Sequence, residues 1–479
     1  MHTTMMRTTR SWPTRGVALL AVFALAACGG SGSRTPPTTS NIFTVGGGVA
    51  GLRGSGLTLR DNGGIPLAVM GNGQFSFPTL VDTGTFYAVT IATQPTNPTQ
   101  TCTLVNGSGT VADASVISID VYCANPAGGF LYLAASAEPL GESTVSGTVS
   151  PYSINPTTGV LTAVGGAIAT GINPNNIAID PLDRFILIGN GCSVLCGPGT
   201  ISAYTVDPAN GSLTPVAGNP ITAPTGGGTD IAIGASGQFV YVTALPSLAQ
   251  QVGEGISLYS IDPPTGVLTL INEDEVFSGE LPGPTVIAAG GLLAYTSFGT
   301  TLDPLFINTT TGALTEAQPN NSLNVSGSFD YMAIDPTGRF LYTLDETGTQ
   351  ILGYVINPTT AALTPIAGSP FALGITATNG PSMDPTGAFL YLPYATGINA
   401  YAINPGTGAL TVAAAPAITI DDPGLLSFDP SGTFAYTLYG DQASELAGFT
   451  INTSTGALTA VSGNPLVTAV YSNAIAVSH

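Results

Sequence analysis

The chain has 479 residues, of which 8% are charged, and 28 of them are acidic against eight basic ones. Every basic residue is an arginine, and soluble domains normally have about a quarter of their residues charged. The formal net charge of −20 opposes binding to nucleic acid and to anionic membrane surfaces. The 62 glycines and 37 prolines exclude a long helical array and favour strands joined by turns.

Residues 1–27 have the features of an export signal. Arg7, Arg10 and Arg15 precede the apolar run "GVALLAVFALAA", which is twelve residues long. A helix that spans a bilayer needs about 20 apolar residues, whereas a signal peptide needs only 7 to 15. We therefore predict a cleaved signal peptide rather than a membrane helix.

The apolar run ends in "LAACGG", which resembles the lipobox of bacterial lipoproteins. The resemblance implies that Cys28 becomes the acylated first residue of the mature chain. Gly29 after it, in place of Asp, implies outer-membrane sorting in a Gram-negative organism or display at the cell surface. The alternative is an ordinary cleavage site at which a cysteine stands by coincidence. Residues 28–40, with "GSGSRTPPTTS", have the composition of a flexible tether.

Residues 41–123 form a second compositional unit. Short apolar runs such as "LTLRD", "FYAVTIA" and "VISIDVYC" are separated by Gly and Asn turns. This pattern predicts a small β-sandwich, and it resembles the immunoglobulin-like domains of bacterial surface proteins. We expect this unit to be a spacer, and ligand binding is the alternative role.

The five cysteines fit an exported protein. Cys28 is the predicted anchor, and the others fall into two local pairs, Cys102 with Cys123 and Cys192 with Cys196. An oxidising compartment favours two disulfides. The second pair could instead bind a metal or act in redox chemistry, but no histidine lies near it and its spacing is not CxxC.

Two phrases recur in phase along the rest of the chain. The first is "INPTTGVLTAV" and its relatives, and the second is "DPTGRFLY" and its relatives. The first phrase occurs seven times, between 46 and 55 residues apart. Its glycine position is occupied in chain order by Gly159, Gly211, Gly266, Gly312, Ala361, Gly408 and Gly456. A fixed period of this length is typical of a propeller.

Each phrase contains turn chemistry between two strands. Asp-Pro-x-Gly favours a type I turn, and the flanking runs alternate apolar and small residues. One repeat thus predicts four antiparallel strands, a to d, and seven repeats predict an all-β, seven-bladed β-propeller over residues 124–479. The final run "NAIAV", which ends at Val477, matches strand a. It should complete the first blade, which opens at Asn125 without a strand a of its own.

The repeated pattern resembles the lactonase-type seven-bladed propellers, the family of 6-phosphogluconolactonase and fungal muconate cycloisomerase. The resemblance covers residues 125–479 and implies hydrolysis of a lactone by His and Arg side chains near the central opening. The mature chain has one histidine, His479, and the propeller arginines, Arg184 and Arg339, fall in a-to-b turns. No residue can be carried over to the family's catalytic roles, so we assign none.

Polar residues just before strand a should crowd the mouth of the central channel. They are Asn176, Asp230, Asp330, Asn379 and Asp422. They could cap strand ends and hold water, or they could form a shallow site for a cation, a sugar or a protein. The variable b-to-c and d-to-a loops belong to the same face, where function is expected. "NEDE" at Asn272 lacks a calcium-loop pattern and indicates a solvated acidic loop.

These features predict an exported, lipid-anchored propeller that acts as a binding or scaffold module for an unknown protein or carbohydrate at the cell envelope. The alternative is a hydrolase of a neutral lactone. The acidic loop face should repel a phosphorylated substrate. No cofactor or metal site is expected beyond weak binding of divalent cations, and contact with the membrane is expected only through the lipid anchor.

Overall fold

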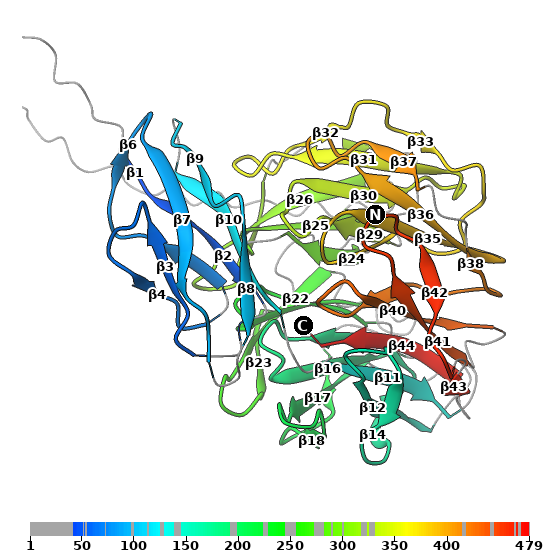
Figure 1. Ribbon diagram of the computed structural model, residues 1–479. Coiled ribbons are helices and arrows are strands. Elements are labelled where there is room, and N and C mark those ends of the chain that lie inside the picture. Colours follow the sequence, from blue (N-terminus) through cyan, green and yellow to red (C-terminus); the bar gives the residue numbers. More distant parts are fainter. Residues whose placement is uncertain are drawn as a thin grey trace, which may run out of the picture. The chain divides into compact units, whose positions relative to one another are not determined.

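The computed structural model consists of strands and turns, and no helix occurs in the residues that it describes (Figure 1). It describes residues 42–478 except 51, 53–54, 72, 97–99, 113–114, 125–128, 138–144, 192–198, 224–228, 245–254, 273–281, 289–290, 299–300, 318–322, 325–330, 414–417, 441–444, 464–465 and 468–470. Cys28, Cys192, Cys196, Asp330 and His479 lie outside these residues. Within them we find no helix that is long and apolar enough to cross a membrane.

The first ten strands form a β-sandwich. They are β1 (Ile42–Phe43), β2 (Val45–Ala50), β3 (Thr58–Asp61), β4 (Leu67–Ala68), β5 (Gly73–Ser76), β6 (Val81–Asp82), β7 (Phe86–Thr93), β8 (Thr101–Val105), β9 (Ser108–Thr110) and β10 (Val116–Ala124). One sheet has the order β5-β2-β10-β8 and the other β4-β3-β7-β9, while β1 pairs with β6. Val45 and Ile119 of the first sheet share one buried cluster with Leu59 and Val89 of the second. This shared core confirms the predicted sandwich.

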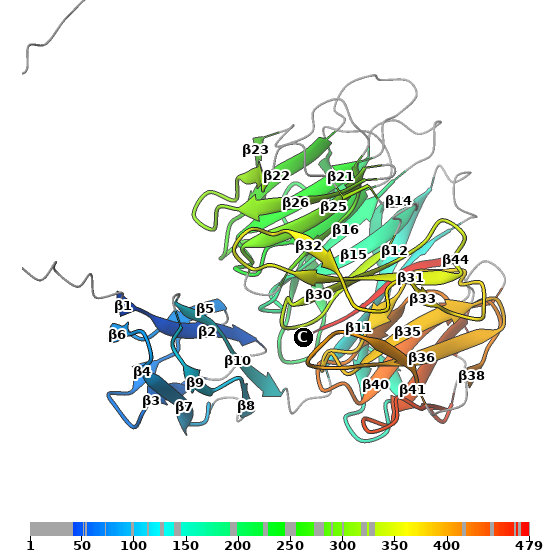
Figure 2. The same cartoon turned by 90° about the horizontal axis from the view of Figure 1, so that it is seen from above.

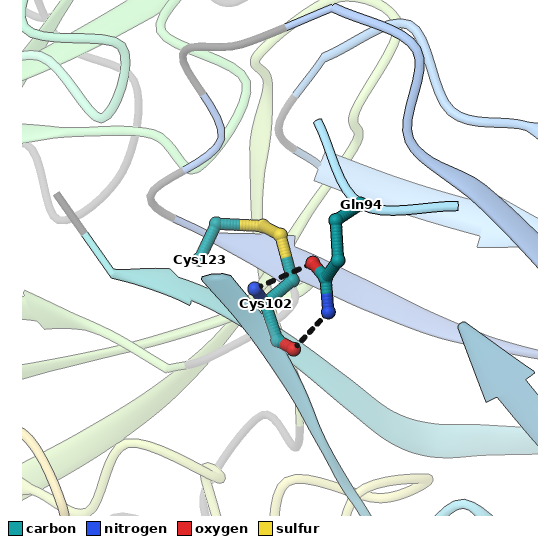
Figure 3. Close-up of a disulfide and its surroundings, with 3 residues drawn as sticks. All are labelled: Gln94, Cys102 and Cys123. Atoms are coloured by element: carbon teal, nitrogen blue, oxygen red, sulfur yellow. Dashed lines mark hydrogen bonds between the residues drawn. A yellow bond between two sulfur atoms is a disulfide. The ribbon is translucent and has the colours of Figure 1, made fainter. Parts of the chain in front are cut away.

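A disulfide joins Cys102 of β8 to Cys123 of β10 (Figure 3). The two residues stand directly opposite each other in the antiparallel β8–β10 pair. The side-chain amide of Gln94 donates to the Cys102 carbonyl at 3.0 Å and accepts from the Cys102 N–H at 2.8 Å. The disulfide predicted for this pair is therefore confirmed, and it lies within one sheet rather than between the two.

The remaining strands build seven sheets of the same design. Strand a of blades one to seven is β44 (Tyr471–Val477), β15 (Pro174–Ile179), β20 (Thr229–Ile233), β24 (Pro282–Ile287), β29 (Met332–Ile334), β34 (Ser382–Met383) and β39 (Leu426–Phe428). Strand b is β11 (Phe130–Ser136), β16 (Phe185–Asn190), β21 (Phe239–Ala244), β25 (Leu293–Phe298), β30 (Phe340–Leu344), β35 (Phe389–Tyr394) and β40 (Phe434–Tyr439). Strand c is β12 (Ser146–Ile154), β17 (Thr200–Val206), β22 (Gly255–Ile261), β26 (Thr301–Ile307), β31 (Gln350–Ile356), β36 (Gly397–Ile403) and β41 (Glu445–Ile451).

The outer strand d is followed in six blades by an element that was not predicted. Strand d is β13 (Leu161–Ala163), β18 (Leu213–Pro215), β23 (Leu268–Asn272), β27 (Leu314–Glu316), β32 (Leu363–Pro365), β37 (Leu410–Val412) and β42 (Leu458–Ala460). In six blades a second short strand pairs with the other end of strand c. These strands are β14 (Ile168–Ile172), β19 (Ile221–Thr222), β28 (Leu323–Asn324), β33 (Phe371–Ala372), β38 (Ile418–Thr419) and β43 (Leu466–Val467). The four predicted strands a to d are therefore present in these blades, and each of them has a further short strand after turn residues such as those of "AGSP" that the sequence analysis did not predict.

The C-terminal strand closes the ring. β44 pairs antiparallel with β11, so that the first blade combines the two ends of the propeller sequence. Neighbouring blades also share buried clusters: Phe389 and Tyr391 of blade six pack with Leu426 and Phe449 of blade seven. Figure 2 shows the strands of these two blades, β35 and β36 beside β40 and β41, in orange. The predicted seven-bladed propeller and its closure are confirmed.

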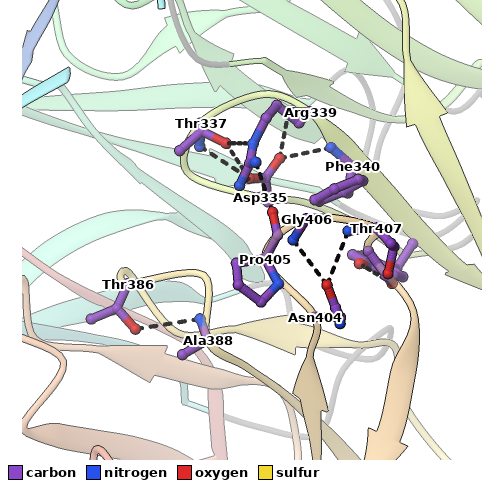
Figure 4. Close-up of polar contacts among 12 residues, drawn as sticks. Asp335, Thr337, Arg339, Phe340, Thr386, Ala388, Asn404, Pro405, Gly406 and Thr407 are labelled. Atoms are coloured by element: carbon purple, nitrogen blue, oxygen red, sulfur yellow. Dashed lines mark hydrogen bonds and ion pairs between the residues drawn. The ribbon is translucent and has the colours of Figure 1, made fainter. Parts of the chain in front are cut away.

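The Asp-Pro-x-Gly phrase forms the a-to-b turn as predicted. In blade five the Gly338 N–H donates to the Asp335 carbonyl at 2.7 Å, which is the bond of a type I turn. The buried Asp335 carboxylate accepts hydrogen bonds from the N–H groups of Arg339 and Phe340 (Figure 4). In blade one Ser478 takes this position, and its Oγ accepts from the Phe130 N–H at 2.8 Å.

A tyrosine in strand b bonds each of six blades to the next. Tyr342, for example, donates from its hydroxyl to the carbonyl of Gly408, the turn glycine of the following blade, at 2.7 Å. Equivalent bonds start from Tyr132, Tyr241, Tyr295, Tyr391 and Tyr436. Burial raises the pKa of the Tyr342 hydroxyl, so that it stays protonated and donates. The two recurring phrases are thus the two halves of one contact between blades, which we call the tyrosine latch.

The ring of a phenylalanine packs on the same turn glycine. A methyl group at Gly408, which has φ of +72°, would lie 2.6 Å from Cδ1 of Phe340 in the preceding blade. The one repeat with alanine at this position, Ala361, follows the one blade in which leucine, Leu293, replaces the phenylalanine. Ala361 and Leu293 share a buried cluster. The smaller side chain therefore makes room for the extra methyl group.

This compensation predicts a non-additive pair of substitutions. Leu293→Phe should lower the free energy of unfolding by about 1–3 kcal/mol, because the ring collides with the methyl group of Ala361. Adding Ala361→Gly should restore most of that loss, and denaturant unfolding of the two single variants and the double variant measures the coupling. Equal destabilisation by Leu293→Phe with alanine or glycine at residue 361 would contradict the argument.

Candidate functional site

The b-to-c and d-to-a loops lie on one face of the propeller. The Ala377 N–H, in a d-to-a loop, donates to the carbonyl of Gly348 in a b-to-c turn at 2.8 Å. The Gly440 N–H, after strand b of blade seven, donates to the Asp421 carbonyl of the preceding d-to-a loop at 3.0 Å. The Asp-Pro-x-Gly and Asn-Pro-x-Thr-Gly turns belong to the other ends of the same strands, so they form the opposite face.

The central channel is lined by the a strands, and the predicted polar residues gather there. Asn176, Asp230, Asn379 and Asp422 all line it. The half-exposed side chains of Tyr331 and Leu425 line it as well, with exposed fractions of 38% and 40%. Asp330 lies outside the described residues. The channel mouth thus combines polar acceptors with apolar surface.

Asp230 connects the a strands of three blades. The Asn176 side-chain amide of blade two donates to one carboxylate oxygen at 2.8 Å, and the Thr285 N–H of blade four donates to the other at 3.1 Å. Burial raises the pKa of Asp230 above its ordinary value of 3.8, and the hydrogen bonds oppose this rise only in part. Asp230 is therefore a half-buried acid whose pKa lies above that of an exposed aspartate.

Asn176 leaves one acceptor beside this acid. Its Nδ2 is used by Asp230, whereas its Oδ1 is buried and receives no hydrogen bond within the described residues. A buried carbonyl oxygen without a donor costs about 1–3 kcal/mol. A ligand that brings a hydroxyl or ammonium donor to Asn176 would recover this cost.

The other asparagines at the mouth hold neighbouring strands together. Asn379 Nδ2 donates to the Pro423 carbonyl of the next blade at 3.1 Å. Asn473, which the sequence analysis did not select, donates to the Pro174 carbonyl at 2.8 Å and to Ser136 Oγ at 2.6 Å. Its position in the C-terminal strand, which the sequence analysis matched to strand a, could have identified it as a channel residue. These two residues support the channel wall, so they are weaker candidates for ligand binding than Asn176 and Asp230.

Both propeller arginines are engaged on the opposite face. Arg184 forms an ion pair with the buried Asp180 at 2.8 Å and donates to the Gly237 carbonyl of the next blade at 3.1 Å. Arg339 donates to the Pro405 carbonyl of the next blade at 2.8 Å, and its guanidinium stacks on Phe340 (Figure 4). Arg339 lines the cavity at that end, so the part of the described channel without a cationic side chain is the mouth on the b-to-c and d-to-a face. Within the described residues there is also no cluster of three potential metal ligands.

The raised pKa of Asp230 predicts how stability depends on pH. An acid whose pKa is higher in the folded state stabilises the fold below its unfolded pKa of 3.8, and this contribution is lost as pH rises through the folded-state pKa. The difference in unfolding free energy between the wild type and Asp230→Asn should therefore fall as pH rises from 3.5 to 7, on denaturant unfolding at each pH. Asp207→Asn, in an exposed c-to-d turn where other blades have Asn, is the matched control. A difference that grows with pH would show that Asp230 prefers its charged form.

Comparison with known proteins gives the fold. No protein-family model and no curated protein sequence matches the chain. Among solved structures, a candidate 6-phosphogluconolactonase of Bacteroides fragilis matches with a TM-score of 0.60 and 15% identity, over 74% of this chain and 100% of that one. The periplasmic gluconolactonase of Pseudomonas aeruginosa matches with a TM-score of 0.58 and 15% identity, over 73% and 99%. The chain therefore has the fold of the lactonase-like β-propellers.

Proposed function

We propose that this protein is an exported, lipid-anchored binding module whose ligand enters the channel mouth on the b-to-c and d-to-a face. The disulfide between Cys102 and Cys123 supports export, because such bonds persist in oxidising compartments. The fold shared with a periplasmic gluconolactonase points the same way. The sandwich, which we take to be immunoglobulin-like, serves as the spacer between the acylated Cys28 and the propeller.

The main support for this proposal is that hydrogen-bond acceptors lie at the channel mouth and the cationic side chains of the propeller lie elsewhere. Asp230 and Asn176 offer carboxylate and amide oxygens at the channel, whereas Arg184 and Arg339 are committed to contacts on the opposite face. Such a site matches a ligand that donates hydrogen bonds and has no negative charge. Neutral carbohydrates and cationic protein segments have this chemistry, and divalent cations could bind weakly.

A neutral-lactone hydrolase is the second candidate, and the half-buried acid favours it. A carboxyl group with a raised pKa is suited to general acid–base chemistry near neutral pH. Asp230 would take a proton from the water that attacks the lactone carbonyl and pass it to the ring oxygen as the ring C–O bond breaks, while the Asn176 side chain holds the carboxylate in place. One solved structure with this fold is described as a periplasmic gluconolactonase and another as a candidate 6-phosphogluconolactonase.

A matched pair of ligands tests the site. We expect gluconolactone, or glucose as its reduced analogue, to bind to the mature chain. The 6-phosphorylated forms should bind about tenfold more weakly at low salt, because the carboxylates of Asp230 and Asp422 line the mouth. Isothermal titration measures the binding. Asp230→Asn should weaken binding of the neutral ligand, and Asp207→Asn on the opposite face should leave it unchanged.

The same samples separate binding from catalysis. Ligand retention without turnover supports the binding module, whereas lactone hydrolysis that is lost in Asp230→Asn supports the hydrolase. Tighter binding of the phosphorylated ligand would reject both readings, since the site would then contain a cation that the proposal excludes.

Acylation of Cys28 has its own test. Cys28→Ser should move the protein from the membrane fraction to the soluble fraction, or leave the signal peptide uncleaved, because acyl transfer requires the thiol. Fractionation and intact mass of the expressed chain measure this. Unchanged fractionation with cleavage still ahead of residue 28 would contradict lipid anchoring.

A further inference from the structure

The described part of the sandwich exposes five bulky apolar side chains, namely Met70 and four others on short loops and strand ends. Ile42, Ile65, Leu80 and Phe86 have exposed fractions of 50%, 90%, 51% and 58%. Single exposed apolar residues are common on soluble proteins, but a group at one place marks a contact surface. The question is therefore whether these four residues are neighbours.

Backbone hydrogen bonds connect the segments that carry three of them. Ile42 of β1 pairs with Asp82 of β6, and Leu80 precedes β6 by one residue. The Thr85 N–H donates to the Asp82 carbonyl at 3.1 Å, and Phe86 follows Thr85 at the start of β7. Figure 1 shows β1 and β6 together at one end of the sandwich. Three of the four residues thus belong to that end.

The fourth residue reaches the same end through a turn. Asn62 Nδ2 donates to the Phe86 carbonyl at 2.9 Å, and the Asn62 N–H donates to the Ala88 carbonyl at 2.9 Å. The turn after Asn62 carries Ile65 before the chain enters β4. We call Ile42, Ile65, Leu80 and Phe86 the apolar tip.

The position of the tip along the chain indicates that its contact partner is a lipid bilayer. The chain enters the sandwich at Ile42, and the predicted acylated residue, Cys28, precedes Ile42 by fourteen residues. Fourteen residues span at most about 50 Å when fully extended. A bilayer that holds the acyl chains of Cys28 therefore stays within reach of Ile42 and of the apolar tip.

The charges near the tip restrict the kind of lipid. Asp82 is exposed, and Asp61 accepts from the Ala88 N–H at 2.9 Å. The exposed Arg60 beside Asp61 offsets one of these charges, but the acidic composition of the chain still opposes contact with anionic lipids. Apolar side chains that enter the headgroup region remain favourable on a zwitterionic surface.

We propose that the apolar tip is a second membrane contact, which inserts into the interface of a zwitterionic bilayer. The proposal rests on the lipid-anchored part of the proposed function, since the anchor brings the bilayer within reach. It extends that function, because the membrane then touches the folded sandwich as well as the acyl chains.

Flotation with phosphatidylcholine vesicles tests the tip without the anchor. The mature chain carrying Cys28→Ser should float with the vesicles, and Ile65→Ser with Phe86→Ser in the same chain should lower its partition coefficient about tenfold. Met70→Ser is the matched control. Met70 is 94% exposed but lies beyond the opposite end of the β3–β4 pair, where the Val69 N–H bonds to Leu57, so its loss should change nothing.

The flotation result does not depend on acylation, because the chain tested carries Cys28→Ser. Acylation itself is tested separately by cell fractionation of the Cys28→Ser variant. Absence of flotation by the Cys28→Ser chain at millimolar lipid overturns the proposal, as does an equal loss caused by Met70→Ser. Stronger binding to vesicles that contain phosphatidylglycerol also overturns it, because electrostatic attraction would then explain the contact. Equal thermal unfolding of all variants verifies that the substitutions leave the fold intact.

Discussion

The tyrosine latch is the contact on which the propeller depends. Strand b of one blade presents Phe and Tyr, and the c-to-d turn of the next presents a glycine in the left-handed region, so that the Phe340 ring covers Gly408 while the Tyr342 hydroxyl bonds its carbonyl. Each bond contributes about 1 kcal/mol, but it occurs at six of the seven junctions and always links one blade to the next. The period of the sequence is therefore the period of a contact between blades rather than of a single blade.

The two faces of the propeller therefore have different roles. Contacts between neighbouring blades on one face use the turn glycines, the capping aspartates and both propeller arginines. The hydrogen bond from Arg339 to the Pro405 carbonyl of the next blade is an example. The described b-to-c and d-to-a segments of the opposite face show no such repeated contact, and the loops of that face differ in length along the sequence. The channel mouth opens on that variable face, where Asp230 and Asn176 meet.

Residue patterns predict the parts of this structure that depend on local chemistry. Turn residues and alternating apolar residues predicted the four strands of a blade. The isolated strand-like run that ends at Val477 predicted closure of the ring by β44. The further short strand after strand d was not predictable, because Leu363 and Phe371 pair with opposite ends of one strand c only in three dimensions. The same is true of the site. The repeat pattern predicted that Asn176 and Asp230 lie at the channel mouth, but it did not predict the hydrogen bond between these residues of two neighbouring blades. The contact from Asn473 to Pro174 exists only because the C-terminal strand closes the ring.

The half-buried acid costs stability, and the fold does not offset that cost with a cation. The buried turn aspartates are held in two ways: Asp180 pairs with Arg184, whereas Asp384 and Asp429 accept hydrogen bonds from hydroxyl and backbone N–H groups of their own turns. Asp230 also receives only uncharged donors, and burial raises its pKa. A residue that serves the scaffold alone could be asparagine, which would bond Asn176 and Thr285 without the desolvation of a charge. Burial also raises the pKa of Asp384, which lies in an a-to-b turn, so Asp230 differs from the turn acids in place rather than in titration. Its donors come from two other blades and it lines the channel, which makes it the acid best placed to meet a ligand.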